Sequence, residues 1–185
     1  MALLLAVCLV AIARSRTQII AAVVLLTVAA APNFVVGQRG PYAKEHMDFT
    51  QVARVIEQHA AAGDCLILDN TIRWVPGPVR AITAAHPDVY AKLVDPGRGR
   101  RAIDRNMLWD GHLGIWSWKG RMAQCTTIWT VSDRDPTRPD HEAGDGVQAG
   151  KTLSRRPAYQ VPASLGFRVV ERWQFSFAQV VKSAR

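Results

Sequence analysis

The stretch "MDFTQVARVIEQHAAAGDCLILDN", residues 47–70, predicts the fold class. Apolar residues in its first half recur at helical spacing and give the segment one apolar face. Asp48 can cap the start of this helix, with Gln51 three residues later in the capping-box position, and Gly63 is placed to end it. The residues of the apolar face are Phe49, Val52, Ala53, Ile56 and Ala60.

The run "CLILD" that follows this helix is short and continuously apolar, which is typical of a buried strand. A second strand is expected in "CTTIWTV", residues 125–131. The closing segment "GFRVVERWQFSFAQVVKSAR" alternates as two strands with a bend near Ser176. A helix, a tight turn and a strand form half of an α/β unit, so we expect a small mixed-sheet α/β domain over residues 41–185.

The segments between these elements give weaker signals. A short helix is expected from about Pro78, since proline suits the first helical position, and His86 before Pro87 marks its end. "DPGRGRRAIDR", residues 95–105, reads as a basic connector, and "MLWDGHLGIWSWKGRMAQ", residues 107–124, as helical in its second part. Residues from about 133 to 164 are polar and rich in Asp, Arg, Pro and Gly, which predicts a long, flexible, exposed loop.

An uncharged run from Thr17 to Gln38 precedes this domain. It exceeds the about 20 helical residues that cross a bilayer, so we expect a transmembrane helix over residues 17–38. Residues 1–13 are apolar but shorter, which indicates a partial or truncated membrane helix. The basic "RSR" between the two runs favours a cytoplasmic loop, and the C-terminal domain is then extracytoplasmic at the cell membrane. A cleaved signal peptide is the competing interpretation, because "TVAAAP" offers small residues before a cleavage point.

The chain is basic, with 23 Lys and Arg against 15 Asp and Glu and a pI near 10.0. Such a surface suits an anionic partner. Beside a membrane helix, the lipid bilayer or a phosphorylated substrate outranks nucleic acid, which we do not expect as a partner. "RGRR" at residues 98–101 can meet anionic headgroups, although a solvated loop explains it equally well.

Three cysteines are present: Cys8 in the first apolar run, and Cys65 and Cys125 in predicted core segments. An oxidising compartment would permit a disulfide between the last two, but one pair in a domain of this size is not a disulfide framework. The sequence therefore favours two buried free thiols. No cysteine spacing resembles a zinc site.

The order of segments resembles the C-terminal end of polytopic GT-C-type glycosyltransferases, the mannosyltransferase-like membrane proteins that use polyprenyl-phosphate sugars. The resemblance rests on "GPYAKEHMDFTQVARVIEQHAAAGDCLILDN" after the last membrane helix, on "TIWTVS", and on the closing "LGFRVVERWQFSFAQVV". It implies a glycosyltransferase tail domain whose partners are a polyprenyl-phosphate sugar and the upstream membrane half of the same enzyme.

The catalytic acidic residue of that family lies in the first extracytoplasmic loop, and nothing in this chain corresponds to that loop. The resemblance therefore implies a truncated or split member, or a free-standing tail domain, with no catalytic residue and no cofactor of its own. The alternative, from a different class, is a non-enzymatic membrane-anchored extracytoplasmic domain for binding or interaction.

The best candidate for a substrate or phosphate site is "LDNTIRW". Asp69 and Asn70 follow the first predicted strand, and open α/β sheets bind ligands outside such strand ends. Arg73 and Trp74 would add a phosphate fork and a stacking aromatic ring. Ordinary turn chemistry is the competing explanation.

Two further sets of residues are candidates for contacts outside that site. Trp and basic residues gather at membrane interfaces, although two of the three tryptophans Trp109, Trp116 and Trp118 would more commonly belong to the core. Asp133 and Asp135 form an Asp-x-Asp pair that can hold a divalent cation, but a polar loop after a strand gives the same residues and is the favoured interpretation. The candidate interface residues are Arg14, Arg16, Arg39, Tyr42, Trp116 and Trp118.

Overall fold

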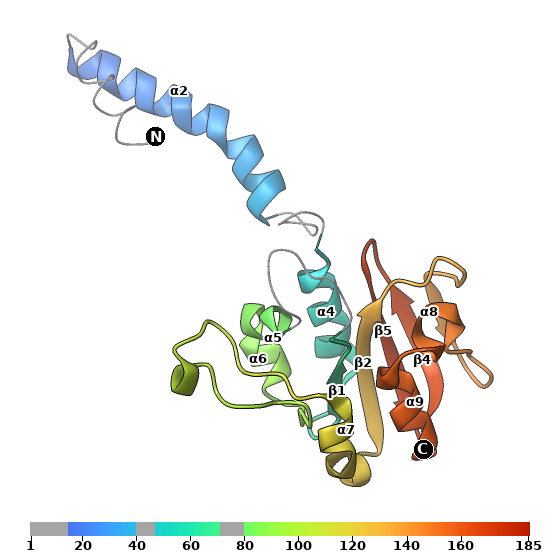
Figure 1. Ribbon diagram of the computed structural model, residues 1–185. Helices are drawn as coiled ribbons and strands as arrows, with labels where there is room; N and C mark the ends of the chain where they lie inside the picture. Colours follow the sequence, from blue (N-terminus) through green and yellow to red (C-terminus); the bar gives the residue numbers. More distant parts are fainter. Residues whose placement is uncertain (1–14, 40–46, 71–79) are drawn as a thin grey trace. The chain divides into compact units, whose positions relative to one another are not determined.

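The computed structural model describes residues 15–39, 47–70 and 80–185, with the backbone alone at 38 and 39 (Figure 1). The chain divides into two units, Met1–Ala43 and Lys44–Arg185. The second unit is a mixed α/β structure, as the sequence predicts.

A five-stranded mixed sheet forms the centre of the α/β unit, in the order β1-β2-β5-β4-β3. The strands β1 and β2 pair in parallel, with Cys65 opposite Ile128, and the other neighbours are antiparallel. The predicted hairpin is confirmed as β4 and β5, and both predicted buried strands are present. The bounds are β1 (Cys65–Leu68), β2 (Thr127–Asp133), β3 (His141–Ala143), β4 (Arg168–Gln174) and β5 (Ala178–Ala184).

Alternate residues of the sheet belong to two separate cores, because successive side chains of a strand point to opposite faces. Leu66 and Leu68 join the cluster with α4 (Phe49–His59) and α6 (Pro87–Tyr90). Ile67 joins the cluster with α7 (Ile115–Trp118), the 3₁₀ helix η3 (Lys119–Gln124), α8 (Gly150–Ser154) and α9 (Pro157–Ser164). The strand β1 is therefore buried on both faces although it ends the strand order, which explains the continuously apolar run "CLIL".

The helix α4 confirms the predicted apolar face, with Val52 and Ile56 fully buried. The predicted capping box is wrong, because the Asp48 side chain makes no bond to the helix N-terminus. Its Oδ2 instead accepts hydrogen bonds of 2.6 Å from the N–H groups of Phe177 and Ala178. Burial raises the pKa of Asp48 more than these hydrogen bonds lower it. Asp48 thus ties the start of α4 to the β4–β5 turn.

The helical predictions after β1 hold in part. The start near Pro78 lies outside the described residues, while α5 (Ala81–Ala85) ends before His86, as expected. Gly63 is in a turn with φ of +90°, after α4 has ended at His59. The connector contains the short 3₁₀ helix η2 (Ile103–Arg105), and the second half of residues 107–124 is helical in α7 and η3.

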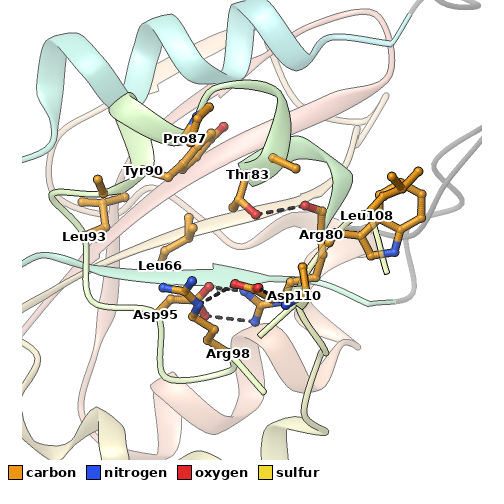
Figure 2. Close-up of a pocket in the computed structure, with 14 residues that line it drawn as sticks. Leu66, Arg80, Thr83, Pro87, Tyr90, Leu93, Asp95, Arg98, Leu108 and Asp110 are labelled. Carbon is orange, nitrogen blue, oxygen red and sulfur yellow. Dashed lines mark hydrogen bonds and ion pairs between the residues drawn. The ribbon is translucent and has the colours of Figure 1, made fainter. Parts of the chain in front are cut away.

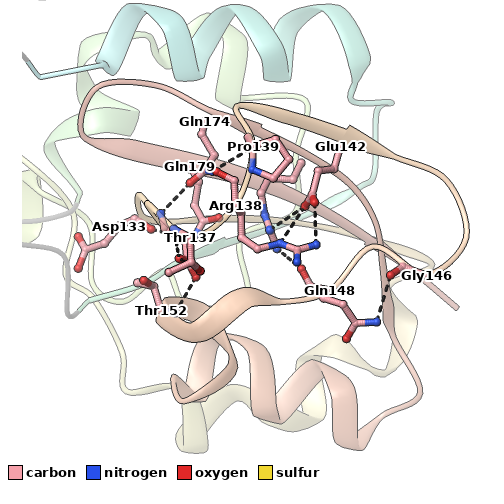
Figure 3. Close-up of polar contacts among 12 residues, drawn as sticks. Asp133, Thr137, Arg138, Pro139, Glu142, Gly146, Gln148, Thr152, Gln174 and Gln179 are labelled. Carbon is pink, nitrogen blue, oxygen red and sulfur yellow. Dashed lines mark hydrogen bonds and ion pairs between the residues drawn. The ribbon is translucent and has the colours of Figure 1, made fainter.

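The prediction of a flexible exposed loop over about 133–164 is wrong. This segment forms β3, α8 and α9, and Leu153 and Val161 are each 1% exposed in the core. A polar network holds it to the sheet (Figure 3). Arg172 of β4 is fully buried and donates to Glu142 and to the Gln148 carbonyl, while the Asp135 carboxylate accepts the Thr152 N–H at 2.8 Å. We call these residues the Asp135–Arg172 network.

The prediction of free thiols at Cys65 and Cys125 is also wrong, because the two form a disulfide with their Cα atoms 5.8 Å apart. Cys65 begins β1, and Cys125 lies just before β2. Parallel pairing of these strands brings their starts together across 60 residues of sequence. The spacing of two cysteines in the sequence does not reveal a disulfide that forms only because the fold brings them together.

The first unit contains α2 (Arg16–Phe34), continued by a π-helical turn η1 (Val35–Arg39). Within the described part of the chain, one helix is long and apolar enough to cross a membrane, and it covers Arg16–Gly37. None of the side chains of α2 is buried. A signal sequence near the N-terminus can have the same length and composition.

Candidate functional site

A cavity of about 620 Å³ lies beside β1, between the α5–α6 segment and the loop that follows it (Figure 2). Its volume is in the range of small-molecule sites. Side chains from four parts of the chain line it, among them Leu66 of β1, Tyr90 of α6, and Leu108 and Trp109 of the later loop. We call it the Arg80 cavity.

Arg80 and Asp95 form the most buried ion pair at this cavity. The Arg80 side chain is 2% exposed and donates from both Nη atoms to the two Asp95 oxygens, with Nη2 3.0 Å from Oδ1. The Arg80 Nε has no hydrogen-bond partner among the described residues. Such a two-point contact fixes the guanidinium plane as well as its charge.

A second ion pair joins Arg98 and Asp110, with Nε 2.5 Å from Oδ2. The other Asp110 oxygen accepts the Ala102 N–H at 2.7 Å. Burial acts to raise the pKa of Asp110, but the hydrogen bonds from Ala102 and Arg98 and the charges of Arg98 and Arg80 lower it below its ordinary value. Asp110 is therefore ionised at neutral pH, and it interacts with both arginines.

The imidazole of His112 is affected by the charges of Arg80 and Asp95 and also by that of Asp69, a residue of the site predicted from the sequence. Burial lowers its pKa first and the charge of Arg80 lowers it further, while Asp95 and Asp69 raise it. The Nδ1 atom of His112 is buried without a hydrogen-bond partner among the described residues. The charge of Asp69 therefore acts on the same imidazole as the charges of Arg80 and Asp95.

The other residues of the predicted site contribute less to this arrangement. Asp69 is 3% exposed, and its backbone N–H donates to the Val131 carbonyl at 2.9 Å. Asn70 is exposed in the turn after β1. Arg73 and Trp74 lie outside the described residues, so their predicted roles stay predictions. The predicted substrate or phosphate role of Asp69 and Asn70 therefore stays a prediction as well, because neither residue lines the cavity.

An apolar surface completes the cavity. Leu66, Leu93 and Pro87 line it together with the aromatic rings of Tyr90 and Trp109. The Tyr90 hydroxyl is buried and has no hydrogen-bond partner among the described residues, and burial raises its pKa above the ordinary value. The hydroxyl is therefore neutral at physiological pH.

The charges that line the cavity balance, with two arginines against two aspartates. This balance is a poor match for a bare phosphate. Guanidinium groups donate hydrogen bonds and carboxylates accept them, so the cavity offers both partners that the hydroxyl groups of a sugar need. The apolar faces of Trp109 and Tyr90 suit the carbon side of such a ring.

The weak metal prediction at Asp133 and Asp135 gains no support from the contacts. Asp135 is fully buried, and its oxygens accept hydrogen bonds from Thr137 and from the Thr152 N–H. Asp133 pairs with Arg156 at 3.5 Å. Among the described residues, no group of three acidic, His or Cys side chains is placed to hold a metal ion. The structure thus uses Asp135 to fasten α8 to the sheet.

The predicted interface residues fall into three groups. Trp118 is 2% exposed and its Nε1 donates to the Leu113 carbonyl, so its assignment to a membrane interface is wrong. Trp116 is 69% exposed, and Arg16 is exposed at the start of α2. Arg14 and Tyr42 lie outside the described residues, and only the backbone of Arg39 is described.

Comparison of the chain with family models, curated proteins and solved structures finds no match. Sequence reasoning did not find Arg80, Asp95, Asp110 or His112 as a group. Arg80 and Asp95 are 15 residues apart and Arg98 and Asp110 are 12 apart, with no regular element joining them. A signal was available only in the mixture of Arg, Asp and Trp along residues 95–118.

Proposed function

We propose that this chain is the C-terminal region of a membrane glycosyltransferase of the GT-C type. In this proposal the α/β unit lies outside the cytoplasm and binds the sugar of a polyprenyl-phosphate donor in the Arg80 cavity. The observation that carries the proposal is the pairing of two Arg–Asp ion pairs with aromatic rings around a cavity of about 620 Å³. Catalysis is supplied elsewhere in the complete enzyme.

Two features support the extracytoplasmic location. Disulfides persist in oxidising compartments and are rare in the cytosol of most organisms, and the α/β unit carries one between Cys65 and Cys125. The preceding apolar helix, Arg16–Gly37, has the length of a bilayer span. An anchor followed by an oxidised domain is the arrangement expected for a protein outside the cytoplasm.

The binding test uses the full chain in detergent with polyprenyl-phosphate mannose as the probe, measured by calorimetry. The Trp109→Ala chain should bind at least roughly tenfold more weakly, since loss of a buried aromatic contact costs about 1.4 kcal/mol or more. Trp116→Ala is the matched control, because Trp116 is exposed and does not line the cavity. Equal affinities of the two variants would contradict binding of the sugar in the Arg80 cavity.

The charged groups are tested by a second matched pair. Arg98→Ala removes a guanidinium that lines the cavity, whereas Arg101→Ala removes one that pairs with Asp104 away from it. Weaker sugar binding is expected for Arg98→Ala alone. Free polyprenyl phosphate without sugar is the second probe, and binding equal to that of the sugar-linked lipid would contradict recognition of the sugar.

The location is tested with a tag at the C-terminus of the chain. Protease added outside intact cells should remove the tag, while the protein fractionates with membranes. Protection of the tag until lysis, in a protein that remains with the bilayer, would place the α/β unit in the cytoplasm and contradict the proposal.

A further inference from the structure

The loop of residues 98–111 is a closed protrusion from the α/β unit, and we call it the arginine loop. Its base is paired by hydrogen bonds of 2.8 Å from the Gly99 N–H to the Gly111 carbonyl and from the Gly111 N–H to the Arg100 carbonyl. A Cβ on Gly99 would lie 3.1 Å from the Gly111 backbone, so this close approach favours glycine. Figure 1 draws the loop, with η2 within it, extending away from the sheet.

Hydrogen bonds also fix the interior of the loop. The Arg105 and Met107 N–H groups both donate to the Ala102 carbonyl, at 3.1 and 3.0 Å. The Asp110 carboxylate accepts the Ala102 N–H and the Arg98 Nε. The arginine loop is therefore organised before it meets any partner, which lowers the entropy lost on binding.

The tip of this loop carries three large apolar side chains in solvent. Ile103 is 78% exposed, Met107 50% and Leu108 82%. A fixed loop has no internal reason to project such residues together, and exposed apolar groups of this kind mark contact surfaces. A partner with an apolar interior would cover these side chains.

The same loop carries four arginines. Arg98, Arg100, Arg101 and Arg105 are all exposed, against Asp104 and Asp110 in the same loop. Both aspartates are paired, with Arg101 and Arg98, and neither Arg100 nor Arg105 forms an ion pair with a described carboxylate. Unpaired cations beside exposed apolar groups match an anionic lipid surface, where both kinds of contact add to binding.

An apolar helix anchored in a membrane would keep the arginine loop within reach of a lipid surface. Residues 38–46 join the apolar helix to the α/β unit, and an extended chain of that length spans at most roughly 35 Å. We propose that the arginine loop docks on an anionic bilayer, with Ile103, Met107 and Leu108 among the headgroups and the arginines against lipid phosphates. This inference rests on the membrane anchoring in the proposed function.

Docking would also explain how a lipid-linked sugar reaches the Arg80 cavity. Arg98, Ala102, Leu108, Trp109 and Asp110 belong to the arginine loop and line the cavity as well. Leu108 is at once the most exposed of the three apolar residues at the tip and part of the cavity wall (Figure 2). With the tip in the headgroups, the cavity opens at the membrane surface, so the sugar enters while its lipid remains in the bilayer.

The test uses the full chain in nanodiscs of phosphatidylcholine, with or without phosphatidylglycerol. The fluorophore NBD is attached at Leu108→Cys in a Cys8→Ser background, and the disulfide protects the remaining cysteines. We expect nitroxide-labelled lipid to quench the probe in anionic discs. The matched control is Asp145→Cys, after β3 at the opposite edge of the sheet, where no quenching is expected.

The arginines are tested in the same discs with Arg100→Ala and Arg105→Ala combined. At about 1 kcal/mol per basic residue near the surface, the ratio of docked to free loop should fall roughly 30-fold. Quenching at 108 that equals quenching at 145, or that the double variant does not change, would overturn the docking proposal. A chain that fails to enter the discs would instead contradict the anchoring.

Discussion

The Arg80 cavity and the Asp135–Arg172 network are both built from arginine and aspartate, on opposite halves of one sheet. In the network, the Asp135 carboxylate accepts backbone N–H groups of Thr137 and Thr152, and Arg172 donates to a backbone carbonyl. At the cavity, Arg80 and Asp95 satisfy each other through their side chains, and both line open space. Contacts to backbone fix a segment, whereas side-chain pairs beside a cavity leave donors and acceptors that a ligand can use.

The largest loss of unfolding free energy is expected from Arg172→Ala. It leaves Glu142 in a partly buried network without one of its cations, and removal of one partner from a buried ion pair costs about 3–5 kcal/mol. Arg101→Ala is the control, because the side chains of Arg101 and Asp104 are 67% and 49% exposed, and such surface pairs contribute about 1 kcal/mol or less. Urea denaturation of the full chain in detergent measures both, and equal losses would contradict a structural role for the network.

Removal of the disulfide should loosen the cavity side of the sheet more than the network side. Cys125→Ser opens the link at the start of β1 and β2, and loss of a native disulfide typically costs about 2–5 kcal/mol. Hydrogen exchange should accelerate in β1 before it does in β4. Cys8→Ser is the control that keeps the disulfide, and uniform acceleration across all strands would remove the distinction between the two regions.

The network can be probed by adding one methyl group. Gly150 has a φ of +77°, and a Cβ there would collide with the Asp135 carboxylate, whereas Gly146 has a φ of +95° with open space around it. Both alanine variants carry the left-handed backbone cost of about 1–2 kcal/mol, and Gly150→Ala should add roughly 1–3 kcal/mol from overpacking. Thermal unfolding compares the two variants. Equal melting temperatures would show that α8 shifts to accommodate the added methyl group without loss of stability.

The smallest effect is expected from replacing His112, whose imidazole is affected by the charges of Arg80 and Asp95. Its pKa in the folded protein is below the ordinary 6.5, so the unfolded chain takes up a proton first as the pH falls through about 6.5. Protonation then favours the unfolded chain, and wild type should lose stability over this interval. His112→Gln should lose less, as measured by melting temperature against pH. Parallel pH profiles would mean that His112 is solvated in the folded state.

Local sequence patterns were sufficient for the main elements. The apolar spacing of α4, the continuous run of β1 and the alternation of β4 and β5 each report burial through neighbouring residues. The pattern failed at residues 133–164, because the side chains that order this segment are polar. Asp135 and Arg172 resemble loop residues until their partners are known.

None of the described residues that line the Arg80 cavity was predicted as a substrate or phosphate ligand from the sequence. Strand ends are recognisable from the sequence, and the charge of Asp69 does act on His112, but Asp69 does not line the cavity. Arg80 and Asp95 could not be paired in advance, because no helix or strand periodicity relates them. Trp116 and Trp118 illustrate the same limit, since two residues of one short helix differ from 69% to 2% in exposure.

The sequence by itself determined the apolar helix near the N-terminus, the α/β class and the positions of the main strands along the chain, since hydrophobic periodicity depends on residues close together in the chain. Tertiary structure alone decided which polar side chains meet. Asp48 bonds to the N–H of Phe177 across 129 residues, and Cys65 bonds to Cys125 across 60. Those partners are set by strand order and register, which bring together residues that no local pattern relates.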